Sequence, residues 1–279
     1  MTIKQIEQAL EEGQSLKTIA AAYSEIANLK IKRIRGEVER NRIFFKEIAR
    51  VYGLVKALAV RRKVNVLKPK KMVSIILTSN YRFYGNINSD LLKFFTASTR
   101  QLDTDRIMLG KAAIDYFRTQ PIFNNYRSIL LKDDEPDPQE LANLVSMIKD
   151  YNQVLIFYST LKTLLLQQPT VIDITASAQV QNIDQEKQKT KFQFIFEPQL
   201  SKILAFFDSQ ILTLLMEGTF LESELSRTAS RFISMDQAET QANQFIKEYE
   251  TLKAYTKRGL DNNTILENYA SMAALRKEL

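Results

Sequence analysis

The sequence contains no cysteine, no histidine and no tryptophan, and it has only 7 glycines and 6 prolines in 279 residues. Without cysteine or histidine there is no thiolate nucleophile, no Cys/His zinc site and no Ser-His-Asp triad, so most familiar enzyme classes are excluded. A disulfide scaffold is excluded for the same reason. Residues 1–68 also lack proline, which favours long uninterrupted helices over a loop-rich β fold.

Long hydrophobic runs are absent too, since none reaches the roughly 18 to 20 residues that span a bilayer. The N-terminal segment MTIKQIEQALEEG carries acidic residues and no continuous apolar stretch, so it resembles neither a signal peptide nor a transit peptide. Because 45% of the residues are hydrophobic, the chain can bury a core, and we expect a soluble globular protein. The net charge of +7 suggests an acidic partner surface or a polyanion.

A heptad pattern from Ile31 onward predicts a long first helix. Its members recur in alternating steps of three and four, with one polar interruption. They are Ile31, Ile34, Val38, Asn41, Phe45, Ile48, Tyr52, Val55 and Ala59. Upstream, the bulky residues Leu16, Ile19, Tyr23 and Ile26 follow the same spacing in a shifted phase, as at a coiled-coil discontinuity. A helix from about Ser15 to about Val60 would be roughly 70 Å long.

A second seam lies near the C-terminus, where no proline follows Pro198. It consists of Leu221, Leu225, Thr228, Phe232, Met235, Ala238, Ala242, Phe245, Tyr249 and Leu252. An isolated amphipathic helix gains little stability, so the two seams are expected to pair as an antiparallel coiled coil. If the intervening segment joins the helices near Ala59 and Leu214, the register follows. The expected neighbours are Ile48 with Leu225 and Ile31 with Ala242.

Between the seams, short apolar runs alternate with helical segments, which indicates a mainly parallel, Rossmann-like α/β domain. The strand candidates are Met72–Leu77, Ile107–Leu109, Ser128–Leu131, Val154–Tyr158, Val171–Ile174 and Phe192–Phe196, the last expected to pair with 171–180. The helix candidates are Asp90–Leu102, Lys111–Phe117 and Pro138–Ile148. We therefore expect a coiled-coil helix at 1–62, the α/β domain at 70–198 and a second coiled-coil helix at 199–279.

The segment LTSNYRFYGNIN at residues 77–88 resembles the Gly-rich turn of gamma subunits of F-type ATP synthases. The family pattern there is S-T/S-D/N-R-G-L-C-G-G-x-N. The positions that fit are Ser79, Asn80, Gly85 and Asn88. Those that depart are Tyr81, Arg82, Tyr84 and Asn86, which replace Arg, Gly, Cys and Gly. Because glycines are lost, we expect this turn to follow a different backbone course.

Further stretches resemble the same family in the same order, so the resemblance spans nearly the whole chain. Residues 19–33, IAAAYSEIANLKIKR, are similar to the ITKAMEMVAASKMRK-type signature. Residues 158–174 resemble S-x-F-x-x-x-x-x-Q-x-P-T, and residues 194–204 resemble Y-x-x-E-P-x-x-x-x-x-L. The stretch from Phe220, FLESELSRTASRFISM, resembles N-x-x-S-E-x-x-A-R-M-x-A-M. Around 259–267, Gly259 and Leu260 stand where the family has an Arg-Gln pair.

The resemblance implies a central rotary shaft that couples rotation to conformational cycling of a catalytic hexamer and is not itself catalytic. It implies no catalytic, cofactor-binding or metal-binding residue. The implied partners are the catalytic and non-catalytic hexamer subunits, with the epsilon subunit and the membrane rotor ring on the other side. The implied location is the prokaryotic cytoplasm, peripheral to the membrane within a complex.

The resemblance also places partner contacts residue by residue. Contacts with the hexamer fall on Tyr23, Lys30, Lys32, Arg33, Thr264 and Met272. Contacts on the rotor-ring and epsilon side fall on Tyr81, Arg82, Phe83, Tyr84 and Gly85. Tyr23 stands where the family has a methionine at the bearing between shaft and hexamer, and its ring and hydroxyl would alter that contact.

Several features allow other interpretations. Basic residues share the first helix, and they could form a solvated coiled-coil face, a nucleic-acid-binding stripe or a contact with acidic hexamer loops. They are Lys30, Lys32, Arg33, Arg35, Arg40, Arg42, Lys46 and Arg50. The acidic residues at 133–137 could ligate a cation, but the interrupting prolines favour a solvated turn. Gly85 alone does not make a phosphate loop. The alternative functions are a basic coiled-coil scaffold or nucleic-acid-binding protein, and an α/β enzyme with no visible site.

Overall fold

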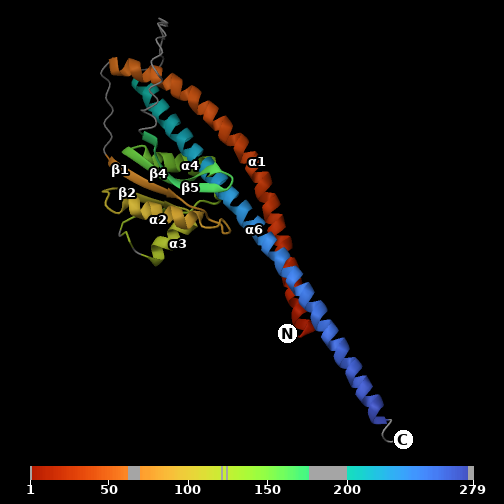
Figure 1. Cartoon of the computed structure of the whole chain (residues 1–279). Helices are drawn as coiled ribbons and strands as arrows, with labels where there is room; N and C mark the ends of the chain where they lie inside the picture. The colour runs from red at the N-terminus through yellow and green to blue at the C-terminus, as the bar shows by residue number, and fades with distance from the viewer. Residues whose placement is uncertain (1, 62–69, 121, 124, 176–199, 276–279) are drawn as a thin grey trace. The chain divides into compact units, whose positions relative to one another are not determined.

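The computed structural model describes residues 2–61, 70–120, 122–123, 125–175 and 200–275 (Figure 1). The chain divides into two compact units, one comprising Ala27–Arg231 and the other comprising Met1–Ile26 with Phe232–Leu279. Two long helices, α1 (Ile3–Arg61) and α6 (Leu200–Leu275), contribute to both units. None of the described helices has the length and apolar character needed to cross a membrane.

The larger unit contains a five-stranded sheet in the order β3-β2-β1-β4-β5. Its strands are β1 (Lys70–Leu77), β2 (Asp105–Leu109), β3 (Arg127–Ile129), β4 (Tyr151–Thr163) and β5 (Leu166–Asp173). All neighbours are parallel except β4 and β5, which form an antiparallel hairpin. The predicted, mainly parallel α/β domain is therefore confirmed.

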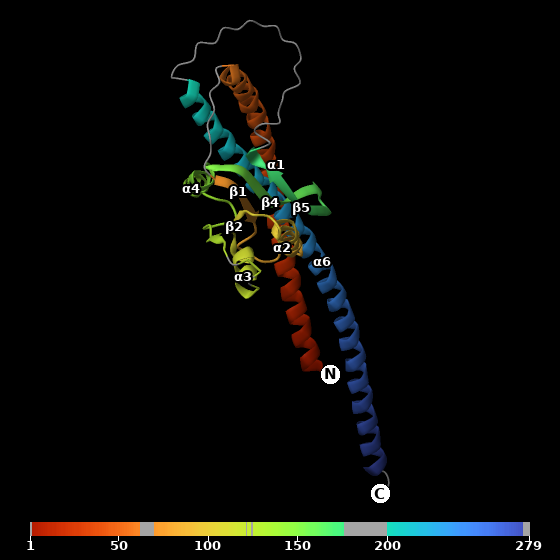
Figure 2. The same cartoon turned by 90° about the vertical axis from the view of Figure 1, so that its left-hand side faces the viewer.

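Helices cover both faces of this sheet. The helices α2 (Ile87–Thr99) and α3 (Lys111–Thr119) lie on one face, while α4 (Pro138–Ile148) and α6 lie on the other (Figures 1 and 2). The first core contains edge-to-face aromatic contacts of Phe95 with Phe117 and Phe157, and the second packs Ile148 and Met216 against the strands. Burial on both faces explains why the strands are continuous apolar runs in the sequence.

Some element boundaries differ from the expected ones. Strand β4 extends to Thr163 and β5 begins at Leu166, because the two strands pair along the length of the hairpin. Helix α2 begins and ends three residues earlier than expected. Helix α4 begins as predicted, because Asp137 caps it in a capping box with Glu140 and Pro138 follows at the first turn. The expected strand Phe192–Phe196 lies outside the described residues.

Within the larger unit, α1 and α6 pack antiparallel through an apolar cluster. Ile34, Val38 and Leu225 form its buried centre, and Ile31, Leu161 and Leu221 pack against them. The predicted seam from Ile31 is thus confirmed at these positions. The predicted register is wrong, because Leu225 packs with Ile34 rather than with Ile48. Ile31, expected near Ala242, belongs to the same cluster. The difference of fourteen residues is two heptads, and it equals the distance between the expected junction at Leu214 and the start of α6 at Leu200.

In the smaller unit, the heptad phase of α1 continues unbroken and does not shift. Its buried positions are Ile6, Gly13 and Ala20, while the bulky residues Leu16, Ile19, Tyr23 and Ile26 are 63%, 53%, 38% and 57% exposed. The expectation that those four residues form the seam is therefore wrong. Small residues face α6 instead, and a Cβ atom on Gly13 would lie 2.9 Å from the Phe245 ring.

Candidate functional site: a buried charge cluster and two exposed surfaces

Arg227 of α6 is the largest fully buried side chain among the described residues, and it is 1% exposed. Its Nη2 and Nε atoms donate to Glu224 Oε2 at 2.8 and 3.3 Å. The other carboxylate oxygen of Glu224 lies 2.5 Å from Lys30 Nζ on α1. Glu224 and Arg227 are three residues apart and share one face of the helix. We call these three residues, Lys30, Glu224 and Arg227, the charge cluster.

The charge cluster extends into two loops of the sheet. Arg227 Nη2 also donates to the Asp134 carbonyl oxygen at 3.3 Å. The Asp134 carboxylate accepts from the Tyr84 hydroxyl and from the Asn80 backbone N–H, both at 2.6 Å. With Asp134 the buried charges balance, two positive against two negative. Asp134 is 4% exposed, so the expected solvated turn is wrong at this residue.

Electrostatics keep the charge cluster ionised. Burial alone would raise the pKa of Glu224, but Arg227 and Lys30 outweigh burial and lower that pKa to about 2. Burial and the nearby carboxylates raise the pKa of Tyr84, so its hydroxyl stays protonated and donates to Asp134. A buried charge is costly unless it is paired and hydrogen-bonded, and here each charge has a partner.

The loop at residues 79–85 presents two exposed aromatic side chains. Tyr81 is 51% exposed and Phe83 is 61% exposed, whereas Tyr84 is buried. Phe83 has a φ of 68°, a left-handed conformation that is strained for a bulky residue, and Gly85 has a φ of 56°. We call this segment the aromatic loop. Phe83 lies next to Arg82, one of the positions at which the family has glycine, and the different backbone course expected for this turn stays a prediction.

Helix α6 contacts the aromatic loop through Ser230 and Arg231. Ser230 Oγ donates to the Tyr84 carbonyl oxygen at 2.8 Å, and Arg231 Nη2 donates to the Arg82 carbonyl oxygen at 3.2 Å. The Arg231 guanidinium also lies over the Tyr84 ring, 4.0 Å from its centroid. The strained conformation persists because these contacts over-determine it.

The predicted basic stripe divides into paired and exposed positions. Lys30 is half-buried and pairs with Glu224 in the charge cluster. Arg33 is exposed but pairs with Glu37 at 3.1 Å and lies 3.9 Å from Glu135. Lys32 is exposed. The positions Arg35, Arg40, Arg42 and Lys46 are exposed as well.

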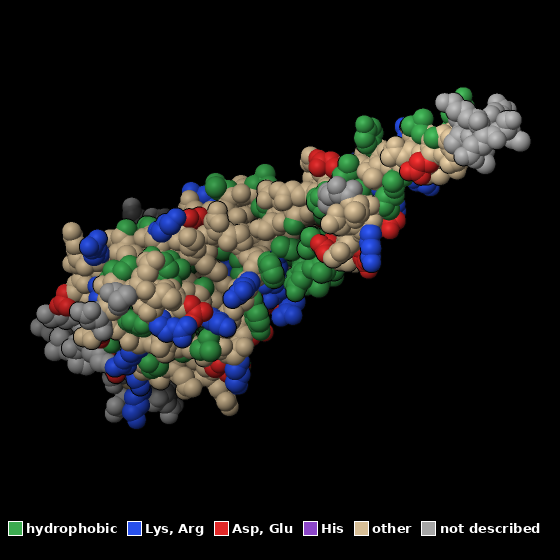
Figure 3. All heavy atoms as spheres, turned by 90° about the horizontal axis from the view of Figure 1, so that it is seen from below, with side chains coloured by type: hydrophobic (Ala, Val, Ile, Leu, Met, Phe, Trp, Pro, Cys, Tyr) green, Lys and Arg blue, Asp and Glu red, His purple; other side chains and the backbone are tan. Residues whose placement is uncertain are grey.

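The other predicted hexamer contacts lie in the smaller unit. Tyr23 belongs to the exposed row Leu16, Ile19, Tyr23 and Ile26, which we call the apolar stripe. Thr264 and Met272 lie on the part of α6 where residues 257–272 are all exposed. Figure 3 shows hydrophobic side chains on the surface of this part of α6, beside acidic and basic ones. Its exposed apolar residues are Leu260, Ile265, Leu266, Tyr269 and Met272.

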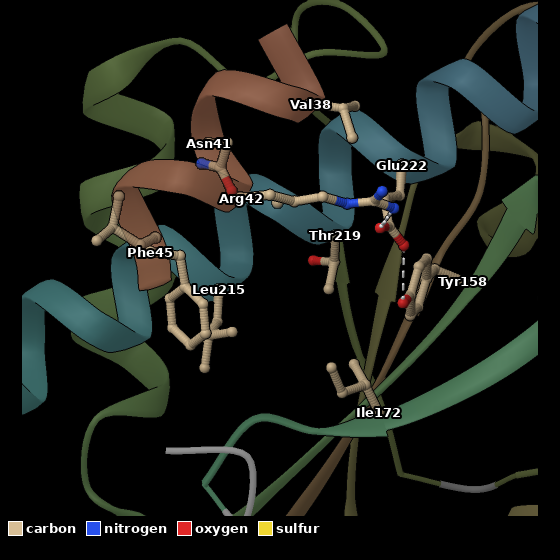
Figure 4. A pocket seen from close by; sticks show the side chains of 11 residues that line it. Val38, Asn41, Arg42, Phe45, Tyr158, Ile172, Leu215, Thr219 and Glu222 are labelled. Carbon is tan, nitrogen blue, oxygen red and sulfur yellow. Dashed lines mark hydrogen bonds and ion pairs between the residues drawn. The ribbon is translucent and has the colours of Figure 1, made fainter. Parts of the chain in front are cut away.

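A cavity of about 120 Å³ lies between α1, α6 and the β4–β5 hairpin (Figure 4). Phe45, Leu215 and Ile172 give it an apolar wall. At its polar end, Arg42 Nη2 and the Tyr158 hydroxyl both donate to Glu222, at 2.7 and 3.2 Å. Because these groups satisfy one another, the described lining contains no charged group that points to a ligand.

A family model described as ATP synthase matches residues 2–258 of this chain. The chain belongs to this ATP synthase family. Among curated relatives, the ATP synthase gamma chain of Bacteroides fragilis is 25% identical over 95% of this chain and 97% of its own length. The ATP synthase gamma chain of Pelotomaculum thermopropionicum is 22% identical over 100% of this chain and 95% of its own. The resemblance to gamma subunits is thus confirmed.

Solved structures with the same fold come from ATP synthases. A chain in the central stalk and c-ring structure of the Tetrahymena thermophila mitochondrial ATP synthase matches with a TM-score of 0.60 and 17% identity, covering 79% of this chain and 99% of that one. A chain in the rotor structure of the Euglena gracilis mitochondrial ATP synthase matches with a TM-score of 0.62 and 14% identity, covering 93% and 98%. At these identities the likeness shows the fold.

Sequence reasoning missed the charge cluster. Both Glu224 and Arg227 lie in the stretch from Phe220 that resembles the family, but that resemblance assigns neither of them a role. One signal was available, since an Arg three residues after a Glu on a seam-bearing helix predicts an ion pair on one face. No local pattern indicates that this pair is buried, because Asp134, which contacts Arg227, lies 93 residues away along the chain.

Proposed function

We propose that this chain is the central rotary shaft, a gamma-like subunit, of an F-type ATP synthase or ATPase, and that it carries torque without catalysing bond making or breaking. The observation that carries the proposal is the family match over residues 2–258. It is supported by a helix pair of the length that a shaft requires, since α1 and α6 contain 59 and 76 residues.

We further propose that the hexamer contacts the smaller unit mainly through apolar side chains. The apolar stripe and the exposed part of α6 place Tyr23, Thr264 and Met272 among other exposed side chains. Exposed apolar patches on soluble proteins commonly mark protein–protein contacts. Lys32 and Arg33 add exposed charge on the neighbouring turns of α1. Lys30 contributes less, because Glu224 neutralises it.

On the proposed rotor-ring and epsilon side, the aromatic loop provides the contact. Tyr81, Arg82 and Phe83 form its outer surface, and exposed aromatic and arginine side chains are the commonest hot spots of protein interfaces. Tyr84 is buried and shapes the loop, whereas Gly85 is exposed at its end. The complex is proposed to lie at the cytoplasmic side of a bacterial membrane, because curated gamma chains of bacteria are among the relatives of this chain.

In this function the shaft alters the energies of other subunits and has no reaction of its own. A rotating asymmetric rod presents different faces to successive catalytic sites. Each face binds one conformation of a site better than another, and the populations shift by that difference.

Co-purification tests the proposal. The chain is expressed with an affinity tag alongside the hexamer subunits of the same cell, and the eluate is fractionated by size. We expect a complex that contains both hexamer subunits and hydrolyses ATP, while the chain alone neither hydrolyses nor tightly binds ATP. Elution with nucleic acid that dissociates as salt is raised would instead support the basic-scaffold alternative. The internal pairs Arg33–Glu37 and Arg42–Glu222 weaken that alternative, because they neutralise part of the stripe.

A further inference from the structure

The aromatic loop and the charge cluster are two ends of one connected set of contacts in the larger unit. At the outer end, Tyr81 and Phe83 are 51% and 61% exposed. At the inner end, Glu224 on α6 pairs with Arg227 on the same helix and with Lys30 on α1. Between them lie Tyr84 and Asp134, which connect the aromatic loop to Arg227.

The connection runs through short polar contacts. The Tyr84 hydroxyl binds the Asp134 carboxylate at 2.6 Å, and the Asp134 carbonyl accepts from Arg227 at 3.3 Å. A second loop contact comes from Asn80, whose side-chain amide donates to the Leu131 carbonyl at 2.9 Å. The two loops are therefore tied to each other at one buried point, and Arg227 connects that point to α6, in addition to the direct contacts of Ser230 and Arg231 with the aromatic loop.

Polar contacts of this kind fix the relative orientation of two elements, which apolar packing does not do. Apolar surfaces resist separation, but they are non-directional and permit small rotations of one element on another. A planar guanidinium, in contrast, fixes the directions of its donors, and a buried network that loses one member leaves an unpaired charge. The charge cluster thus resists changes in orientation as well as separation.

We propose that Arg227 is the positioning residue of a joint that fixes the orientation of the sheet loops on α6 and α1, so that load applied at Tyr81 and Phe83 reaches both helices. The fixed orientation is a property of the chain alone. The transmission of load rests on the proposed function. Arg227 acts through Asp134 and Glu224 and is not assigned any contact with a partner.

The first test uses the isolated full chain, which has no native cysteine to interfere with labelling. Spin labels are attached at Lys93→Cys on α2 and Glu217→Cys on α6, two exposed positions in the larger unit. Pulsed dipolar spectroscopy then measures the distribution of distances between them. Arg227→Met is expected to at least double the width of that distribution. Arg42→Met is the matched control, because Arg42 also pairs with a glutamate across α1 and α6 but is exposed and contacts neither loop. The distance distribution of this control should keep the width seen in the parent.

Arg227→Lys is measured as well, so that the test does not depend on one variant folding. Lysine keeps the charge and the neighbouring Glu224 but loses the planar fork that also reaches the Asp134 carbonyl, and it should broaden the distribution by a smaller factor. Distributions of parent width in the folded Arg227 variants, even with lowered thermal stability, would show that Arg227 stabilises the fold without fixing orientation, and would overturn the proposal.

The second test applies load in the complex. With the hexamer fixed to a surface and a bead attached through Lys93→Cys, the angular spread of the bead is recorded during pauses in rotation. Arg227→Lys should widen the spread about twofold while the unloaded rate of ATP hydrolysis stays within twofold of the parent. An unchanged spread would overturn load transmission. Failure of the parent chain to assemble with the hexamer would instead refute the proposed function, and the label distances would still decide whether the joint exists.

Discussion

The two parts of the α1–α6 pair are built differently although one heptad runs through both. In the larger unit, bulky residues such as Ile34, Val38 and Leu225 fill the seam, and buried charges add to it. In the smaller unit, Gly13 and Ala20 follow Ile6 in the equivalent places on α1, and the bulky residues Leu16, Ile19, Tyr23 and Ile26 are exposed. The larger unit therefore buries more of the bulky apolar side chains of α1 than the smaller unit does.

The ion pairs differ in the same way. Glu224 and Arg227 are each 1% exposed, whereas Glu7 and Lys253, which pair at 2.8 Å in the smaller unit, are 52% and 40% exposed. Exposed pairs are screened by water and contribute little, while buried pairs cannot lose a member without leaving an unpaired charge. Stability should therefore be concentrated in the larger unit.

The largest expected effect comes from removing a buried carboxylate. Glu224→Ala leaves Arg227 and Lys30 without their partner and should lower the free energy of unfolding by about 3–5 kcal/mol. Glu7→Ala, the matched change in the smaller unit, should lower it by less than about 1 kcal/mol. Urea titrations followed by circular dichroism measure both values. If the two variants lose similar amounts of unfolding free energy, the two units do not differ in how much their ion pairs stabilise them.

The next largest effect is a pH dependence of the unfolding free energy that comes from the ionisation of Glu224. The pKa of Glu224 lies below its ordinary value of 4.5, at about 2, so its ionised form stabilises the fold fully above pH 4.5 and loses that contribution as the pH falls towards 2. The shift corresponds to about 3 kcal/mol. The difference in unfolding free energy between the parent and Glu224→Gln should therefore shrink by about that amount across this range. A difference that stays constant with pH would mean that Glu224 is not held by Lys30 and Arg227.

A smaller effect is expected at the small-residue seam. A side chain on Gly13 meets the Phe245 ring and Ile246, so Gly13→Leu should destabilise the smaller unit by roughly 1–3 kcal/mol. Hydrogen exchange of the α6 amides around Phe245 reports the loss directly. Gly259→Leu is the control, because nothing lies within 4 Å of that position and leucine favours a helix by about 1 kcal/mol over glycine. Faster exchange in both variants would show that neither position depends on close packing.

The smallest effect on stability is expected in the apolar stripe. Ile19 is 53% exposed, so Ile19→Ser should change the unfolding free energy by no more than about 0.5 kcal/mol. If the stripe contacts the hexamer, the same change should weaken that association roughly tenfold or more, since burying such a side chain contributes about 1.5–3 kcal/mol. Ile34→Ser, at a fully buried seam position, should instead lose several kcal/mol of stability. If Ile19→Ser leaves the affinity for the hexamer unchanged, the hexamer does not bind the apolar stripe at Ile19.

The sequence was sufficient for features that depend on local pattern. The buried strands are continuous apolar runs because helices cover both faces of the sheet. The start of α4 was predictable because Asp137, Pro138 and Glu140 form a capping sequence. The heptad from Ile31 was predictable because its members are bulky as well as correctly spaced.

Features that depend on which face meets a partner were not predictable. Between residues 13 and 26 the small residues Gly13 and Ala20 of α1 are buried in the seam and the bulky ones are exposed, so the spacing of bulky apolar residues predicts the wrong face. The register failed because heptads repeat, and a shift of two heptads preserves the pattern while changing every partner. The charge cluster combines α1, α6 and a loop residue 93 positions away, and no local pattern links these three segments.

The spacing of Glu224 and Arg227 on one turn of α6 has a consequence for the order of folding. Residues three apart meet as soon as the helix forms, on a timescale of about a microsecond, whereas Asp134 and Lys30 must arrive across long chain segments whose closure is slower. The carboxylate and guanidinium therefore neutralise each other while water still surrounds them. When the loops and α1 later close over this turn, they cover a pair that already exists, and neither ion is stranded in the interior during assembly.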